Sequence, residues 1–170
     1  MLTPVILYEN PWLSLMDVGG YVYSHETRCQ GRIVAMLPFR ETPAGREFLV
    51  RSEITPCWGS DPVLSAVTGG YEGGDIADDA VRELEEETGY LVKEADLIPL
   101  GESYASKSAD TVYTLYAVDV TGLTPGEARG DGSVHESSAT TRWLTPVELV
   151  QIRDPQVAVM YLRLLSKAAG

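Results

Sequence analysis

The sequence contains few cysteines, histidines and basic residues. Two cysteines and two histidines occur in 170 residues, and 13 lysines and arginines stand against 25 aspartates and glutamates. Cys29 and Cys57 belong to no Cys-x-x-Cys pair and lie near no pair of histidines, which fits reduced thiols in the cytoplasm. A single bridge between these two cysteines stays open at this stage.

No cluster of lysine and arginine is present, and the formal net charge is -12. Affinity for a nucleic-acid backbone comes from such clusters, so nucleic-acid binding is not expected. If the substrate carries phosphates, the protein must recruit them through a divalent cation or a locally basic pocket, against its overall field.

Long apolar runs and internal repeats are also missing. No segment reaches the length of a membrane span, and the N-terminal "MLTPVILYENPW" has neither a basic start nor a cleavage site of small residues, so we expect no export and no membrane contact. The composition is 44% hydrophobic and 22% charged, with prolines and glycines scattered along the chain. This balance predicts one compact domain over residues 1–170.

The order of the expected elements indicates an α/β fold. A hairpin is expected around Gly19 and Gly20. Thr145 and Glu148 form a capping box for a short helix, and Asp154 before Pro155 starts another. Further strands are expected in four segments: "RIVAMLPF", "EFLVRSE", "TVYTLYAVDV" and "TTRWL".

A helix is expected over residues 76–88, with Asp75 as its N-cap and Gly89 as its C-terminal stop. This helix ends in acids. Glu83, with the acids three and four residues later, would lie on one face.

Glu83, Glu86 and Glu87 repel one another in that arrangement. Each like-charge pair costs roughly 0.2 to 0.5 kcal/mol, and the negative end of the helix dipole adds to the cost. An acid run is in general a solvated helix face. Here the acids share one face at the unfavourable end, which indicates a bound cation. Ligands that are all oxygen favour Mg²⁺ or Mn²⁺.

The segment "RELEEETG", Arg82 to Gly89, resembles the second half of the Nudix box. This resemblance implies hydrolysis of a nucleoside diphosphate linked to another moiety, with divalent cations, on an α/β/α sandwich with a mixed sheet. The first half departs, because Gly74 stands at the position of the box Glu and Thr68 at that of the box Gly. An alignment without a gap keeps Asp75 as the cap and makes the loop shorter than usual. A gapped alignment would let Asp75 replace the missing Glu.

The resemblance also assigns roles to residues. The metal ligands would be Glu83, Glu87 and the main-chain carbonyl of Gly69, with Glu86 completing the cluster. Bound metals would polarise the phosphates and activate a water. Arg82 would pair with Glu86 and hold it in place rather than contact the substrate. In these terms Glu83, Glu86 and Arg82 belong to the catalytic machinery.

Other candidates lie outside the box. Glu136, in a long polar loop, is the candidate general base, with His135 as its rival and an exposed acid without a role as the alternative. Arg51 would contact the substrate phosphates or would form an ion pair at a sheet edge. Tyr104 and Lys107 follow the acidic helix and could contact the leaving moiety.

The segment "YENPWLSLMDVGGYVYSHE" is similar to the extra sheet that precedes the core in ADP-ribose pyrophosphatases and contributes to a homodimer. Residues 1–30 are therefore expected to form an antiparallel sheet and a dimerisation element, with Trp12 as an interface, base-stacking or core residue. The characteristic Pro of that subfamily is missing, because Ala105 stands there. We expect hydrolysis of ADP-ribose or another nucleotide sugar. A nucleoside triphosphate pyrophosphohydrolase and a regulatory module without turnover remain the alternatives.

Overall fold

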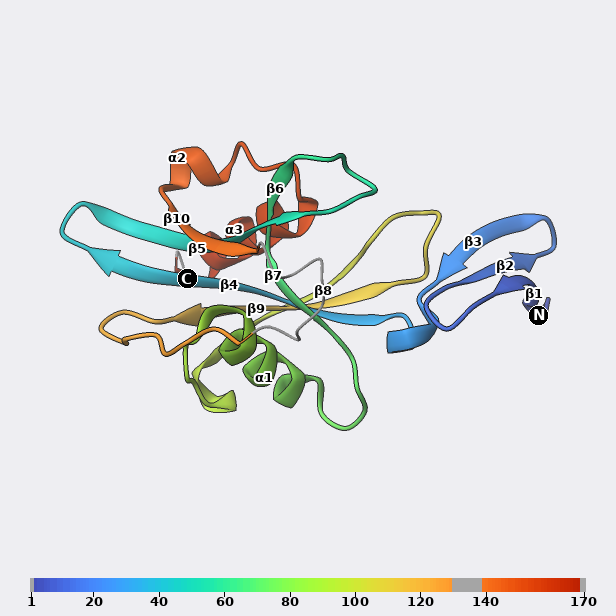
Figure 1. Cartoon of the computed structure of the whole chain (residues 1–170), viewed down its shortest axis with the longest axis horizontal. Helices are drawn as coiled ribbons and strands as arrows, with labels where there is room; N and C mark the ends of the chain where they lie inside the picture. Colours follow the sequence, from blue (N-terminus) through green and yellow to red (C-terminus); the bar gives the residue numbers. More distant parts are fainter. Residues whose placement is uncertain (1, 130–138, 169–170) are drawn as a thin grey trace.

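The computed structural model describes residues 2–129 and 139–168 (Figure 1). Its strands form two sheets, one of three strands at the N-terminus and one of seven strands. The strands of the N-terminal sheet are β1 (Val5–Glu9), β2 (Ser14–Val18) and β3 (Tyr21–His25). The seven-stranded sheet contains β4 (Arg32–Thr42), β5 (Gly45–Ile54), β6 (Pro62–Ser65), β7 (Val67–Gly70), β8 (Leu97–Tyr104), β9 (Val112–Asp119) and β10 (Thr140–Leu144).

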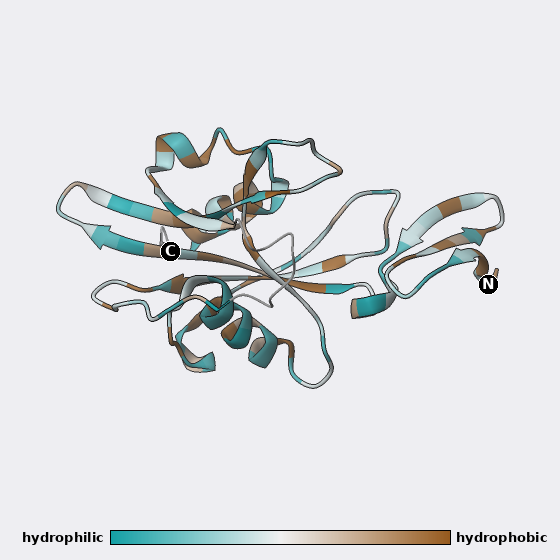
Figure 2. Cartoon of the chain, viewed as in Figure 1, coloured by the Kyte–Doolittle hydropathy of each residue, from teal (hydrophilic) through white to brown (hydrophobic). Residues whose placement is uncertain are grey.

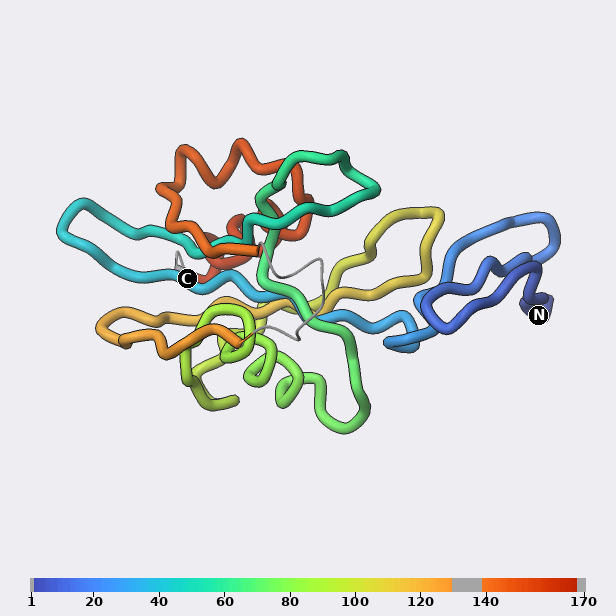
Figure 3. The backbone as a smooth tube through the Cα atoms, in the orientation of Figure 1, coloured from blue at the N-terminus to red at the C-terminus, as the bar shows by residue number. Residues whose placement is uncertain are grey.

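The N-terminal sheet is antiparallel throughout, with β2 between β1 and β3. The expected hairpin is present, and Gly19 and Gly20 turn the chain with φ angles of 62° and 91°. Such left-handed values favour glycine over residues with a side chain. Figure 3 shows these three strands standing at one end of the molecule, beyond the main sheet.

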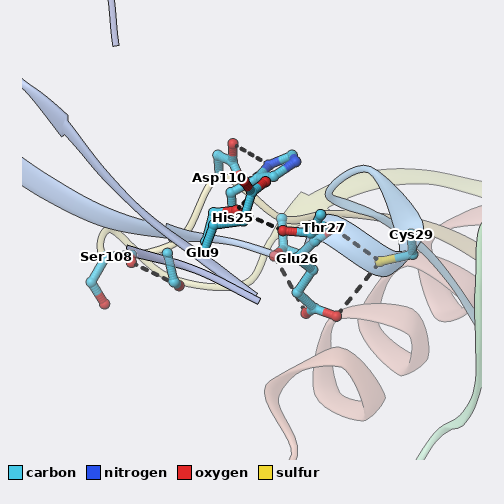
Figure 4. A network of polar contacts seen from close by, with 10 residues as sticks. Glu9, His25, Glu26, Thr27, Cys29, Ser108 and Asp110 are labelled. Carbon is cyan, nitrogen blue, oxygen red and sulfur yellow. Dashed lines mark hydrogen bonds and ion pairs between the residues drawn. The ribbon is translucent and has the colours of Figure 1, made fainter. Parts of the chain in front are cut away.

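A polar network joins the N-terminal sheet to the connection between β8 and β9 (Figure 4). His25 Nδ1 lies 2.9 Å from Asp110 Oδ2, and the backbone N–H of Ser24 donates to the carbonyl of Ser108 at 2.9 Å. Beside it, a short 3-10 helix, η1 (Thr27–Cys29), leads into β4. The sheet is thus attached at β3 as well as through the chain itself.

The seven-stranded sheet is mixed. Its main path runs β10-β5-β4-β9-β8, in which β4 and β9 are parallel and the other pairs are antiparallel. The helix α1 (Ile76–Thr88) packs on β4 and β7, whereas α2 (Pro146–Leu149) and α3 (Pro155–Ala168) lie on the opposite side (Figure 1). The expected α/β/α sandwich with an N-terminal antiparallel sheet is confirmed.

The protein has two hydrophobic cores, one on each face of the seven-stranded sheet, and alternate side chains of β4 belong to each. Val34 and Met36 face Leu84 of α1, and Leu37 belongs to the core around Met160 of α3. All five side chains are fully buried or nearly so. Figure 2 shows hydrophobic residues along these central strands. Successive side chains of a strand point to opposite faces of the sheet. Because helices cover both faces here, both sets of side chains are apolar.

Strands β4 and β5 pair only close to the hairpin that joins them. Residues 39–42 face residues 45–48, after which β6 pairs with the end of β5 and β7 with the start of β4. Ala66, between β6 and β7, is where the chain changes partner. Its N–H donates to buried Asp154 at 2.8 Å, and Asp154 also accepts from the N–H of Gln156 at 2.9 Å. One carboxylate therefore caps α3 and fixes the crossing point.

Local signals located most of the helices correctly. The helix over residues 76–88 begins and ends as expected, and the capping box of Thr145 and Glu148 is present at α2. Strand β1 lies within the antiparallel sheet expected over residues 1–30, whereas strands β6, β7 and β8 were not anticipated. Two of these, β6 and β7, are four residues long, too short for a periodic pattern.

Cys29 is buried and Cys57 is exposed, and both thiols are free. The bridge that the sequence left open is therefore not formed. Separately, within residues 2–129 and 139–168 no helix has the length and apolar character needed to cross a membrane.

Replacing Asp154 with Ala should lower the free energy of unfolding by about 2 to 4 kcal/mol, because it leaves the buried Ala66 N–H without its acceptor and removes the cap of α3. Urea denaturation measures this change. Exposed Asp61 gives the matched control, Asp61→Ala. Equal effects of the two substitutions would show that the crossing point does not depend on Asp154.

Candidate active site

A polar cavity of about 660 Å³ opens beside the C-terminal half of α1. One wall comes from β7 and the residues after it, and the other from α1. A third side is formed by η1 and the end of β5. Gly69 and seven charged residues are among those that line the cavity: Arg28, Glu53, Glu72, Arg82, Glu83, Glu86 and Glu87.

Helix α1 is fixed at both ends. The Asp75 side chain accepts from the N–H of Ala77 at 3.0 Å, and Gly89 adopts φ 75° while its N–H donates to the carbonyl of Glu85 at 2.8 Å. These are the N-cap and C-cap chemistries that the sequence predicted. With its apolar face buried through Leu84, the helix turns its acids toward β7.

Gly69 and Glu83 are in close contact. A Cβ atom built on Gly69 would lie 2.0 Å from Cγ of Glu83, a separation that no side chain tolerates. A side chain at position 69 would therefore force the Glu83 side chain out of its present place. The lack of a side chain at Gly69 thus lets the β7 backbone and the Glu83 side chain lie against each other at the cavity.

Arg82 balances much of the negative charge. Its guanidinium lies 3.1 Å from both Glu83 and Glu86, and 3.3 Å from both Asp79 and Glu72. The expected pair with Glu86 is thus present, within a wider network. One guanidinium facing four carboxylates holds them in place while leaving the cavity strongly acidic.

Arg51 lies behind the cavity, with an exposed fraction of 5%. Its Nη2 is 3.4 Å from Glu87 and 3.2 Å from Glu53, and Glu87 itself is 8% exposed. Of the two roles considered for Arg51, an ion pair is observed, in the interior rather than at a sheet edge. Arg51 positions the last acid of the cluster.

The remaining sequence candidates lie elsewhere. Tyr104 ends β8 and Lys107 lies on the β8–β9 connection, and neither is among the described residues that line the acidic cavity. The Tyr21 hydroxyl donates to the Lys107 carbonyl, so this segment faces the N-terminal sheet. Glu136 and His135 fall outside the described residues.

The cavity shifts the pKa of Glu83 upward. Burial raises the pKa of this carboxyl from 4.5 to about 7, the neighbouring Arg82 opposes the shift, and the charge of Glu86 adds to it. The ionised form of Glu83 is thus disfavoured in the folded protein. A group near a cavity with a pKa close to neutrality is typical of functional sites.

The donor set fits a hard divalent cation. Three carboxylates and a backbone carbonyl offer only oxygen, as Mg²⁺ and Mn²⁺ prefer. Within residues 2–129 and 139–168, however, no three acid, histidine or cysteine side chains are grouped as metal ligands. The carboxylates of Glu83, Glu86 and Glu87 instead point to their arginine partners. To share an ion they must turn from these partners into the cavity.

A family model described as "NUDIX domain" matches residues 30–164. The chain belongs to the NUDIX family. NUDIX proteins are in general hydrolases of phosphoric anhydrides in nucleoside diphosphate derivatives and use divalent metals such as Mg²⁺ or Mn²⁺. A comparison with curated proteins gives no match. The match begins after β3, so it covers the α/β/α core and leaves out the N-terminal sheet.

Three charged residues that line the acidic cavity were missed from the sequence. Glu53 could have been found, because it stands two residues after Arg51 on one strand and hence on the same face. Glu72 lies in the loop before α1, and Arg28 lies on η1. No periodic sequence pattern marks Glu72 or Arg28. The packing of β4 and β7 brings both residues to the cavity.

Replacing Glu83 with Gln should stabilise the chelator-treated protein at pH 8 and not at pH 5. The raised pKa of Glu83 means that its contribution to stability is complete below about pH 4.5 and is lost as the pH rises through about 7. Glutamine cannot ionise, so the variant avoids this loss, by up to about 3 kcal/mol. Thermal unfolding at the two pH values measures the difference.

Exposed Glu85, on the opposite face of α1, provides the control Glu85→Gln. It should unfold like the wild type at each pH. A stabilisation by Glu83→Gln that is the same at pH 5 and pH 8 would contradict the assigned pKa.

Proposed function

We propose that this protein hydrolyses the pyrophosphate linkage of a nucleoside diphosphate derivative, with a nucleotide sugar such as ADP-ribose as the leading substrate class. The observation that carries the proposal is the convergence of Glu83, Glu86 and Glu87 on one cavity with Gly69. Such an arrangement is costly for folding alone, because buried like charges repel one another. A cation between the acids and the substrate phosphates would relieve that cost.

In the proposed reaction, Glu83, Glu86, Glu87 and the Gly69 carbonyl would hold Mg²⁺ or Mn²⁺. The bound metal would polarise the phosphates and lower the pKa of a water. Arg82 would keep Glu86 and Glu83 in position through its ion pairs. Arg51 would do the same for Glu87.

Glu136 remains the proposed general base, on the ground of its place in the polar loop before β10. The structure gives one reason to look there. The first part of that loop is attached to the C-cap of α1, since the N–H of Gly126 donates to the carbonyl of Gly89 at 2.8 Å. The loop therefore leaves from the end of the helix that carries the acids.

The proposal is tested by incubating nucleotide sugars, dinucleotides and nucleoside triphosphates with Mg²⁺ or Mn²⁺ and identifying the phosphate products. Glu83→Gln and Glu87→Gln should lower kcat by orders of magnitude and raise the metal concentration needed for half-maximal rate. Glu136→Gln should lower kcat by roughly 10² to 10⁴ with the metal requirement unchanged. Glu85→Gln should behave as the wild type.

Turnover of triphosphates alone would move the function to a nucleoside triphosphate pyrophosphohydrolase. Binding without turnover of any compound would favour a regulatory module. A shift in metal requirement with Glu136→Gln would make Glu136 a ligand rather than the base.

We also propose a homodimer formed through the N-terminal sheet. Strand β1 is exposed along its whole length although it contains Val5, Ile6 and Leu7, and Trp12 is 65% exposed. Figure 2 shows hydrophobic residues in this sheet. Large apolar side chains exposed together on one small sheet are typical of protein interfaces.

Sedimentation at micromolar concentration should therefore give the mass of two chains. Ile6→Lys, which places a charge in the proposed interface, should shift the mass to one chain. Leu162→Glu changes an equally apolar, exposed residue on α3 and should leave the dimer intact. A wild-type mass of one chain would refute the dimer.

A further inference from the structure

A second cavity of about 670 Å³ lies near the β5–β6 connection. Trp58, Val63 and Leu64 line it from that connection and from β6. Gln151, Ile152 and Arg153, between α2 and α3, line it from the other side. Figure 1 shows both connections on the same side of the sheet.

The chemistry of the lining suits a flat aromatic ring. The Trp58 ring is 55% exposed, although tryptophan normally buries most of its large apolar surface. Leu64 and Ile152 add apolar walls, whereas the exposed Gln151 and Arg153 offer amide and guanidinium groups. A nucleobase needs this combination, with stacking on its faces and hydrogen bonds at its edges. The volume is that of a small-molecule site.

The cavity also adjoins the acidic one. Glu53, which lines the acidic cavity, is the direct cross-strand partner of Val63, which lines the second cavity. Arg51, behind the acids, is paired with Ser65 and is thus a diagonal neighbour of Val63, at about 7–8 Å. The two cavities therefore approach each other at the edge of the β5–β6 pair, where Glu53 and Val63 are neighbours.

We propose that the second cavity is the subsite for the base of the nucleotide substrate, with Trp58 as its stacking platform. The inference rests on the proposed hydrolysis of a nucleoside diphosphate derivative. The diphosphate would lie at Glu83 and Glu87, and the base would lie between Trp58 and Ile152. Arg153 and Gln151 then face the edge of the base and determine which base is preferred.

Neutral nucleosides test the subsite without metal and without turnover. Adenosine, guanosine and uridine, with ribose as the probe that lacks a base, are titrated into the full chain while binding is measured by NMR. At least one nucleoside should bind, and ribose should not. Trp58→Ala should weaken nucleoside binding roughly tenfold to a hundredfold, and Trp58→Phe, which retains a ring, should restore much of it.

The matched control is Leu162→Ala, since Leu162 is also apolar and exposed but lies on α3, outside the residues that line the cavity. It should bind nucleosides as the wild type does. If no nucleoside binds, or if binding survives Trp58→Ala, the subsite is refuted. The same holds if Leu162→Ala abolishes binding and Trp58→Ala does not.

Kinetics separates this inference from the proposed function. On a substrate that is turned over, Trp58→Ala should raise KM about tenfold or more with kcat nearly unchanged, as expected for lost uniform binding. If Trp58→Ala turns the substrate over with an unchanged KM, the subsite is refuted and the proposed hydrolysis is not. Binding that depends on Trp58 without any turnover would support a base site and refute the hydrolysis.

Discussion

The divergence of β4 and β5 is the constraint on which the other features depend. Because the two strands pair only near their hairpin, β6 and β7 occupy the positions beside them and change partner at Ala66. Asp154 fixes this point from α3. On one side of it, β7 brings Gly69 against Glu83. On the other, the β5–β6 connection extends toward the segment between α2 and α3. Both cavities are thus products of one sheet irregularity.

The arrangement of the acidic site is unfavourable for the stability of the fold. Glu83 and Glu87 are withdrawn from water beside other carboxylates, and burial of such groups is unfavourable unless they are compensated. Arg82 and Arg51 supply that compensation, one from the same helix and one from β5. The two arginines keep the carboxylates positioned at a cavity without neutralising it. The two arginines thus let a cluster of partly buried carboxylates persist in a stable fold.

The sequence predicted what local chemistry controls. Asp75 and Gly89 set the ends of α1 through their own hydrogen bonds and backbone angles, so its bounds were predicted to the residue. The direction of Arg51 was not predictable, because its ion pair with Glu87 depends on how α1 packs on β4 and β7. Strands β6 and β7 depend on two different partners and carry no pattern of their own. The β8–β9 connection contacts the N-terminal sheet through Lys107 and Ser108, and no local sequence signal predicts these contacts.

The charge of the acidic cavity has a consequence for the speed of encounter. An anionic nucleotide approaching a chain of net charge -12 through a mouth lined by Glu72, Glu83 and Glu86 meets repulsion at long range. Salt shortens the reach of that repulsion to about 8 Å at physiological ionic strength. Association of the free nucleotide should then accelerate as salt is added, the reverse of an attractively steered encounter. A nucleotide that arrives with its cation already bound carries less negative charge and would be repelled much less. The cation-bound nucleotide should therefore associate faster than the free nucleotide.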